Sequence, residues 1–157
     1  PLRENTLALV QQAKELHLSL RYVSFRWSLG RLAMLNPKES QHLKTLAAKG
    51  KDEENLVSFY DAYSNNGIPQ SVFDEHLLKL YTAFKDLNTQ LSDGRQFLMG
   101  DRISIADVFW SMKMLRLIET GYPFQTLHPT LYQWYQRIYA RPAFQNEVMP
   151  FFLLGQF

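Results

Sequence analysis

Residues 97–108, FLMGDRISIADV, carry the most specific local signal in the chain, the beginning of a helix. Ser104 suits the N-cap position, because its hydroxyl oxygen can accept a hydrogen bond from the backbone N–H of Asp107. The Asp107 carboxylate can accept a bond from the Ser104 N–H in return, which completes a capping box. Ile103 and Val108 stand where two apolar side chains form a hydrophobic staple. We therefore predict a helix beginning at Ser104 and a structural role for Ser104 and Asp107, with a cost of about 1–2 kcal/mol for losing the cap.

The sequence before this stretch has helical periodicity, with apolar residues spaced three and four apart. Two long helices are expected there, over residues 5–35 and 73–91. Their apolar stripes are Leu9, Ala13, Leu16, Leu20, Val23 and Trp27 in the first, and Phe73, Leu77, Leu80, Phe84, Leu87 and Leu91 in the second. Ser71, followed by Asp74 three residues later, is the expected cap of the second helix.

Shorter helices are expected between and after these elements. Asn36 as N-cap, with Pro37 at the first helical position, predicts one start. The acids of residues 51–54 favour another, because negative charge stabilises the N-terminus of a helix. The helix from Ser104 should end at Gly121, a common residue after a helix C-terminus. We expect one all-α helical bundle forming a single domain over residues 1–157.

Length and composition agree with one globular domain. The chain has 157 residues, of which 46% are hydrophobic and 14% aromatic, too many for a disordered polar segment. No apolar run reaches the roughly 18 residues of a membrane helix. There are no cysteines, which removes disulfides and thiolate chemistry and suits a reducing, cytoplasmic setting.

The distribution of charged residues along the chain does not indicate nucleic-acid binding. The 17 Lys and Arg residues are spread along the chain among 15 acids, whereas phosphate recognition needs a basic cluster. Arg21, Arg26 and Arg31 cannot share one helix face, since five residues advance a helix by about 140°. Arg26 is expected to stack on Tyr22, four residues away.

The string around Ser104 resembles the capping-box and staple motif of the C-terminal domain of cytosolic glutathione transferases. In that family the pattern reads roughly Leu-x-Gly-Asp-x-x-Ser/Thr-x-Ala-Asp. The matching residues here are Leu98, Gly100, Asp101, Ser104, Ala106 and Asp107. The order of helices over residues 5–148 is similar to the family's, although residues 36–67 form a longer connection than usual.

The resemblance implies a partner and a chemistry. Such a domain normally follows an N-terminal thioredoxin-like domain, which holds glutathione and supplies the group that activates its thiol. Nothing in the chain resembles that domain, so we expect a fragment of a longer, homodimeric, cytoplasmic protein. This chain would then form the wall of the pocket for a small, apolar electrophilic substrate, and glutathione would be bound mainly elsewhere.

The resemblance also suggests which residues form that wall. In the family the first long helix faces the cleft between the two domains. His17, Arg21, Tyr22 and Phe25 on this helix are therefore candidate substrate contacts, although a mixed stripe beside a core stripe is usually a solvated helix shoulder.

Trp110 is a further candidate, because it lies off the apolar stripe expected for its helix. That stripe is Ile105, Val108, Phe109, Met112 and Leu115. A large aromatic is more often part of a core than of a site. We identify no catalytic residue in the chain. No metal site is expected either, because the four histidines lack ligand spacing.

Two other interpretations remain open. Glutathione-transferase-like helical domains also act as non-catalytic interaction modules in translation-factor and synthetase complexes. The chain could alternatively be an unrelated helical bundle with a chance capping box, in which case the capped helix would not be expected at the centre of the bundle.

Overall fold

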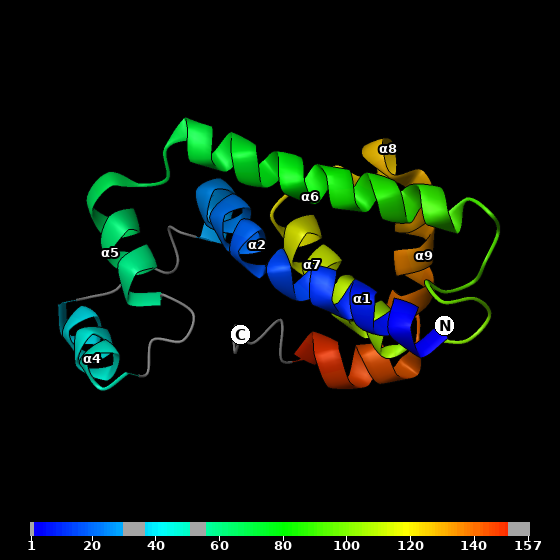
Figure 1. Cartoon of the computed structure of the whole chain (residues 1–157), viewed down its shortest axis with the longest axis horizontal. Coiled ribbons are helices and arrows are strands. Elements are labelled where there is room, and N and C mark those ends of the chain that lie inside the picture. The colour runs from blue at the N-terminus through cyan, green and yellow to red at the C-terminus, as the bar shows by residue number, and fades with distance from the viewer. Residues whose placement is uncertain (1, 30–36, 51–55, 151–157) are drawn as a thin grey trace.

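The computed structural model describes residues 2–29, 37–50 and 56–150 and is all-α, as expected (Figure 1). Within these ranges the β structure is limited to one isolated bridge between Phe97 and Gly100. The helices are α1 (Leu2–Glu15), α2 (His17–Ser24), α4 (Pro37–Ala48), α5 (Leu56–Asn66), α6 (Gln70–Leu91), α7 (Ile105–Glu119), α8 (Phe124–Leu127) and α9 (Pro129–Tyr139), with π-helical segments at Phe25–Leu29 and Phe144–Val148.

The helices pack around α7. It contacts α1, α2 and α9, while α6 runs along α2 and α9 (Figure 1). α4 packs on α5, and this pair lies at one end of the molecule in Figure 1. The fully buried side chains of Phe84, Trp110 and Trp134 bring α6, α7 and α9 together. The capped helix is therefore central, which argues against an unrelated bundle in which it would lie outside.

The first long helix is not continuous, contrary to the prediction for residues 5–35. It breaks at Leu16 into α1 and α2, and from Phe25 to Leu29 it becomes π-helical. α1 packs mainly against α7, whereas α2 packs mainly against α6. The two halves thus have different partners, and a break lets each half turn its apolar side to its own partner. Residues beyond 29 in the predicted helix, including Arg31, lie outside the described residues until Pro37.

The predicted stripe of α7 is wrong at its first two positions. Ile105 and Val108 are 52% and 46% exposed, whereas Leu115 is buried and Phe109 and Met112 are partly buried. The stripe was assigned from apolar residue type alone. Because α7 has neighbours on several sides, small and polar residues on its other faces are buried too. The buried residues of α7 are Ala106, Asp107, Trp110, Ser111, Lys113, Met114, Leu115 and Leu117.

The predicted start of α6 is wrong by a few residues. α6 begins at Gln70 after Pro69, so Ser71 lies inside the helix and is not its cap. Asn36 and the acids of residues 51–54, which were expected to start α4 and α5, lie outside the described residues. None of the helices in the described part of the chain combines the length and apolar character that a membrane span requires.

Candidate functional site

The capping box is present at the start of α7, and its acid does more than cap the helix. Asp107 Oδ2 accepts hydrogen bonds of 2.8 Å from both the backbone N–H and the hydroxyl of Ser104. Asp107 Oδ1 accepts bonds of 2.9 Å from the Leu98 N–H and from Trp134 Nε1. The carboxylate, which is fully buried, therefore joins the loop before α7 to α7 and α9. This arrangement explains Asp107 as a structural residue.

Ile103 and Val108, the pair predicted to form a hydrophobic staple, are 39% and 46% exposed, so each keeps part of its surface in solvent. The start of α7 is specified mainly by the Ser104 and Asp107 hydrogen bonds.

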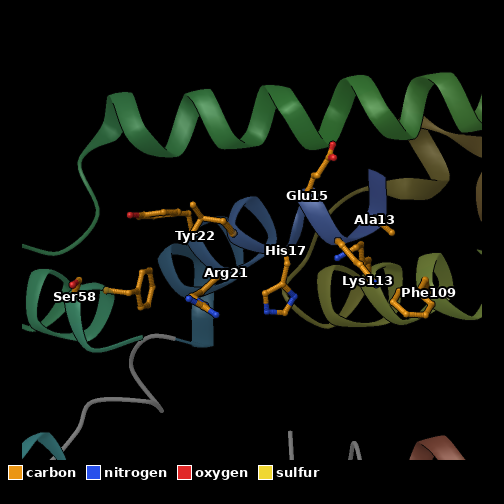
Figure 2. A pocket seen from close by; sticks show the side chains of 11 residues that line it. Ala13, Glu15, His17, Arg21, Tyr22, Ser58, Phe109 and Lys113 are labelled. Carbon is orange, nitrogen blue, oxygen red and sulfur yellow. The ribbon is translucent and has the colours of Figure 1, made fainter. Parts of the chain in front are cut away.

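An open cleft of about 710 Å³ lies where α1, α2, α5 and α7 meet (Figure 2). Its lining mixes aromatic and apolar side chains with cations. The lining residues are Ala13, Lys14, Glu15, His17, Leu18, Arg21, Tyr22, Ser58, Phe59, Phe109 and Lys113. A cleft of this size and composition fits a small organic molecule.

Aromatic contacts fix one end of the cleft. Tyr22 stacks on His76 of α6 with ring centroids 4.5 Å apart, and Phe59 of α5 meets Tyr22 edge-on at 5.3 Å. The His76 Nδ1 is 2.9 Å from the Ser19 hydroxyl, so the histidine is itself held by α2. The guanidinium of Arg21 lies 5.5 Å from the Phe59 ring centroid. Each ring is thus supported by residues from another helix, and this end of the cleft is preformed.

Two buried cations also line the cleft. Arg21 and Lys113 are each only 6% exposed. Burial, and then the nearby Arg116 charge, lower the pKa of the Lys113 ammonium to about 8. Burial also lowers the pKa of Arg116, with a further contribution from Arg21. Arg116 Nε donates to the Ser24 hydroxyl at 2.9 Å, so Arg116 is held in place behind the cleft.

Three of the five predicted substrate contacts lie in the cleft, and two do not. His17, Arg21 and Tyr22 line it together (Figure 2). Phe25 is buried behind it, edge-on to Phe59 at 5.0 Å. Trp110 is completely buried, and its Nε1 donates to the Leu9 carbonyl at 3.1 Å. Phe25 therefore supports Phe59 from behind, Trp110 belongs to the core, and the assignment of all five as substrate contacts stays a prediction.

The prediction missed Phe59, Phe109 and Lys113 as lining residues. A usable signal existed for Lys113, because it stands within a helix that is otherwise rich in apolar residues. Phe59 gives no such signal, since α5 is distant in sequence from α2 and α7. The expected contact of Arg26 with Tyr22 is also wrong. Arg26 instead lies over the Phe73 ring at 5.2 Å and hydrogen-bonds to the Ile68 carbonyl and to Gln70.

A second buried polar pair lies away from the cleft. His128 Nε2 is 2.9 Å from the Tyr122 hydroxyl, and the two rings are stacked. Burial lowers the pKa of His128, and its Nδ1 has no hydrogen-bond partner among the described residues. In that part of the chain, no group of three or more His, Cys, Asp or Glu residues is placed to hold a metal ion.

Comparison with known proteins identifies the family of this fold. The family model described as "Glutathione S-transferase, C-terminal domain" matches residues 44–142, more than half of the chain. The matched region contains the capping box and the cleft residues of α5 and α7. No curated protein and no solved structure matches the chain.

Proposed function

The chain belongs to the glutathione S-transferase C-terminal domain family, and from that premise we propose that it forms the substrate-binding half of a glutathione-transferase-like protein. In glutathione conjugation a glutathione thiolate forms a bond to an electrophilic carbon of an apolar substrate. The bond from that carbon to a leaving group such as chloride breaks, and the leaving group departs with the electron pair. A thioredoxin-like domain would hold glutathione and lower the pKa of its thiol. The chain described here would position the electrophile and exclude water from it.

The main support is the cleft between α1, α2, α5 and α7. Its volume of about 710 Å³ falls in the usual range for small-molecule sites. Tyr22, Phe59 and Phe109 offer apolar surface, and Arg21 and His17 offer polar contacts. We propose His17, Arg21 and Tyr22 as direct substrate contacts, with Phe25 and Trp110 acting only through the packing of the wall.

The exposed side of α7 supports a covering domain beside this cleft. Ile105 and Val108 are exposed, and Phe109 and Met112 are partly exposed on the same side of the helix. Together these four residues form an apolar strip, a surface that soluble proteins usually bury in an interface. Phe109 belongs both to the strip and to the cleft lining. A domain seated on the strip would therefore also border the cleft.

Glutathione itself would depend on that second domain. The cations of the cleft could approach one of its carboxylates, but the chain has no cysteine and no residue assigned here to thiol activation. We also propose, from the family, that the whole protein is a cytoplasmic homodimer. Sedimentation of the native protein over a concentration series should show a dimer, and a monomer at every concentration would contradict this.

A non-catalytic interaction module is the second candidate. The apolar strip of α7 favours it to some degree, because such a strip can bind a different protein as readily as a thioredoxin-like domain. This alternative predicts stable assembly with a heterologous protein and no glutathione-dependent reaction.

The two functions can be separated on native protein recovered from its source with an antibody against this chain. We expect an intact mass above 18.4 kDa by one small domain, together with conjugation of glutathione to 1-chloro-2,4-dinitrobenzene. The 157-residue chain alone serves as the control and should be inactive. Native protein that lacks conjugation and carries a different bound protein would support the interaction module instead.

A further inference from the structure

The Lys113 ammonium belongs to a largely buried side chain that lines the cleft. Its side chain is buried to more than nine-tenths and lines the cleft, yet it makes no hydrogen bond or ion pair with any described residue. A buried charge is costly unless it is paired. With its pKa lowered only to about 8, Lys113 still carries its proton at neutral pH. The ammonium is not among the buried polar atoms without a partner, so it reaches the open space of the cleft while the rest of the side chain is buried.

The surroundings of Lys113 strengthen its positive character. Arg21 and Lys14 line the same cleft, and Arg116 is close enough to lower the pKa of Lys113. Among the described lining residues the acidic side chain is Glu15, whose carboxylate accepts a hydrogen bond from Gln11 at 3.0 Å. An anion entering the cleft would therefore meet an excess of positive charge.

The apolar lining limits what that anion can be. Phe109 and Phe59 contribute apolar ring surface, and in Figure 2 the His17 side chain lies between Arg21 and Phe109. A bare inorganic ion would leave this apolar surface unused. A flat apolar molecule with one charged end would use both parts of the lining.

We propose that the cleft takes an aromatic ligand bearing a carboxylate, with the Lys113 ammonium as its counter-ion. This inference rests on the proposed function, because it names the class of electrophile that the cleft would present to glutathione. Arg21, which lines the same cleft, adds to the positive charge that the anion would meet. The aromatic body would lie against Phe109 and Phe59.

The test compares two ligands of the same shape on the 157-residue chain by calorimetry, 2-naphthoate and its neutral amide, 2-naphthamide. We expect naphthoate to bind about ten- to a hundredfold more tightly, the range for one charged hydrogen bond. Lys113→Met keeps the apolar stem and should remove this advantage while leaving naphthamide affinity unchanged. Lys85→Met, at an exposed position on α6, is the matched control and should leave both affinities unchanged.

Each other outcome has a distinct meaning. Equal binding of the two ligands would overturn the anionic inference and leave the proposed function standing. Failure of both ligands to bind would overturn both. A naphthoate advantage that survives in Lys113→Met would contradict the role of Lys113. Glutathione, titrated in the same way as a third ligand, should bind more weakly than naphthoate, and tighter binding of glutathione would overturn the aromatic carboxylate as the ligand.

Discussion

Asp107 shows how one residue can carry both a local and a long-range role. The spacing of Ser104 and Asp107 predicted the capping box, because its partners are three residues apart. The bonds from Leu98 and Trp134 could not be predicted in the same way. Trp134 is 27 residues away and reaches Asp107 only when α9 packs on α7. A pattern read along the chain identifies the first kind of contact and misses the second.

Replacing Asp107 should therefore lower the free energy of unfolding by more than the loss of a helix cap alone would. Asp107→Ala leaves the Trp134 indole N–H and the Leu98 N–H without their acceptor in the interior. Each buried unsatisfied donor costs about 1–3 kcal/mol, so we expect a loss of about 3 kcal/mol or more in the free energy of unfolding. Urea denaturation measures it, and Asp101→Ala at an exposed position should change stability by less than about 0.5 kcal/mol. A loss within the 1–2 kcal/mol of a simple cap would contradict the role of the long-range bonds.

The two buried histidines predict a loss of stability in mild acid. Burial lowers the pKa of both His76 and His128 below the ordinary value of 6.5. The unfolded chain then binds more protons than the folded one as pH falls below about 6.5, so acid favours unfolding. The contribution of the two histidines to stability should be full above that pH and should decrease below it, by at most about 1.4 kcal/mol per pH unit for each histidine.

Urea unfolding at pH 7.5, 6.5 and 5.5 tests this directly. His76→Gln keeps a polar side chain near the Ser19 hydroxyl and should make the decrease less steep. Stability that stays constant or rises between pH 7.5 and 5.5 would show that the histidines do not act in this way.

At the scale of helices, the sequence predicted the end of α7 better than it predicted which face of α7 is buried. Gly121 ends α7 as predicted, with φ of 96° and its N–H bonded to the Ile118 carbonyl at 3.0 Å. The Tyr122 N–H reaches the Leu117 carbonyl at 2.9 Å, which completes a Schellman motif. The exposure of Ile105 and Val108 of α7 was not predicted, because apolar periodicity cannot distinguish an apolar face that is buried from one that stays exposed.

The Schellman motif predicts a specific effect of substitution at Gly121. A Cβ added there meets no atom within 4 Å, so any cost comes from the left-handed backbone alone. Gly121→Ala should destabilise the protein by about 1–2 kcal/mol. Gly121→Asn should cost less, because asparagine tolerates this conformation better. Equal losses for the two variants, measured by thermal or urea unfolding, would point to packing and not to backbone strain.

At the scale of the whole molecule, the fold could be predicted more fully than the site. The capping box and the helical periodicity indicated the family and the all-α class from local patterns. The cleft depends on how α1, α2, α5 and α7 converge, and α5 brings Phe59 to Tyr22 from 37 residues away in sequence. Resemblance to the family identified His17, Arg21 and Tyr22 because all three lie on one helix. Lys113 and Phe109 required the packing of α7 to be known.

The most direct test of the account is to locate a bound neutral aromatic ligand on the chain. Titration with 2-naphthamide, followed through backbone amide NMR signals, should shift the signals of Arg21, Tyr22, Phe59, Phe109 and Lys113 together. The signals of Trp134 and its neighbours, on the far side of the capping box, should stay in place. Shifts gathered elsewhere on the molecule, or no shifts at all, would contradict the claim that this cleft is the substrate-binding site.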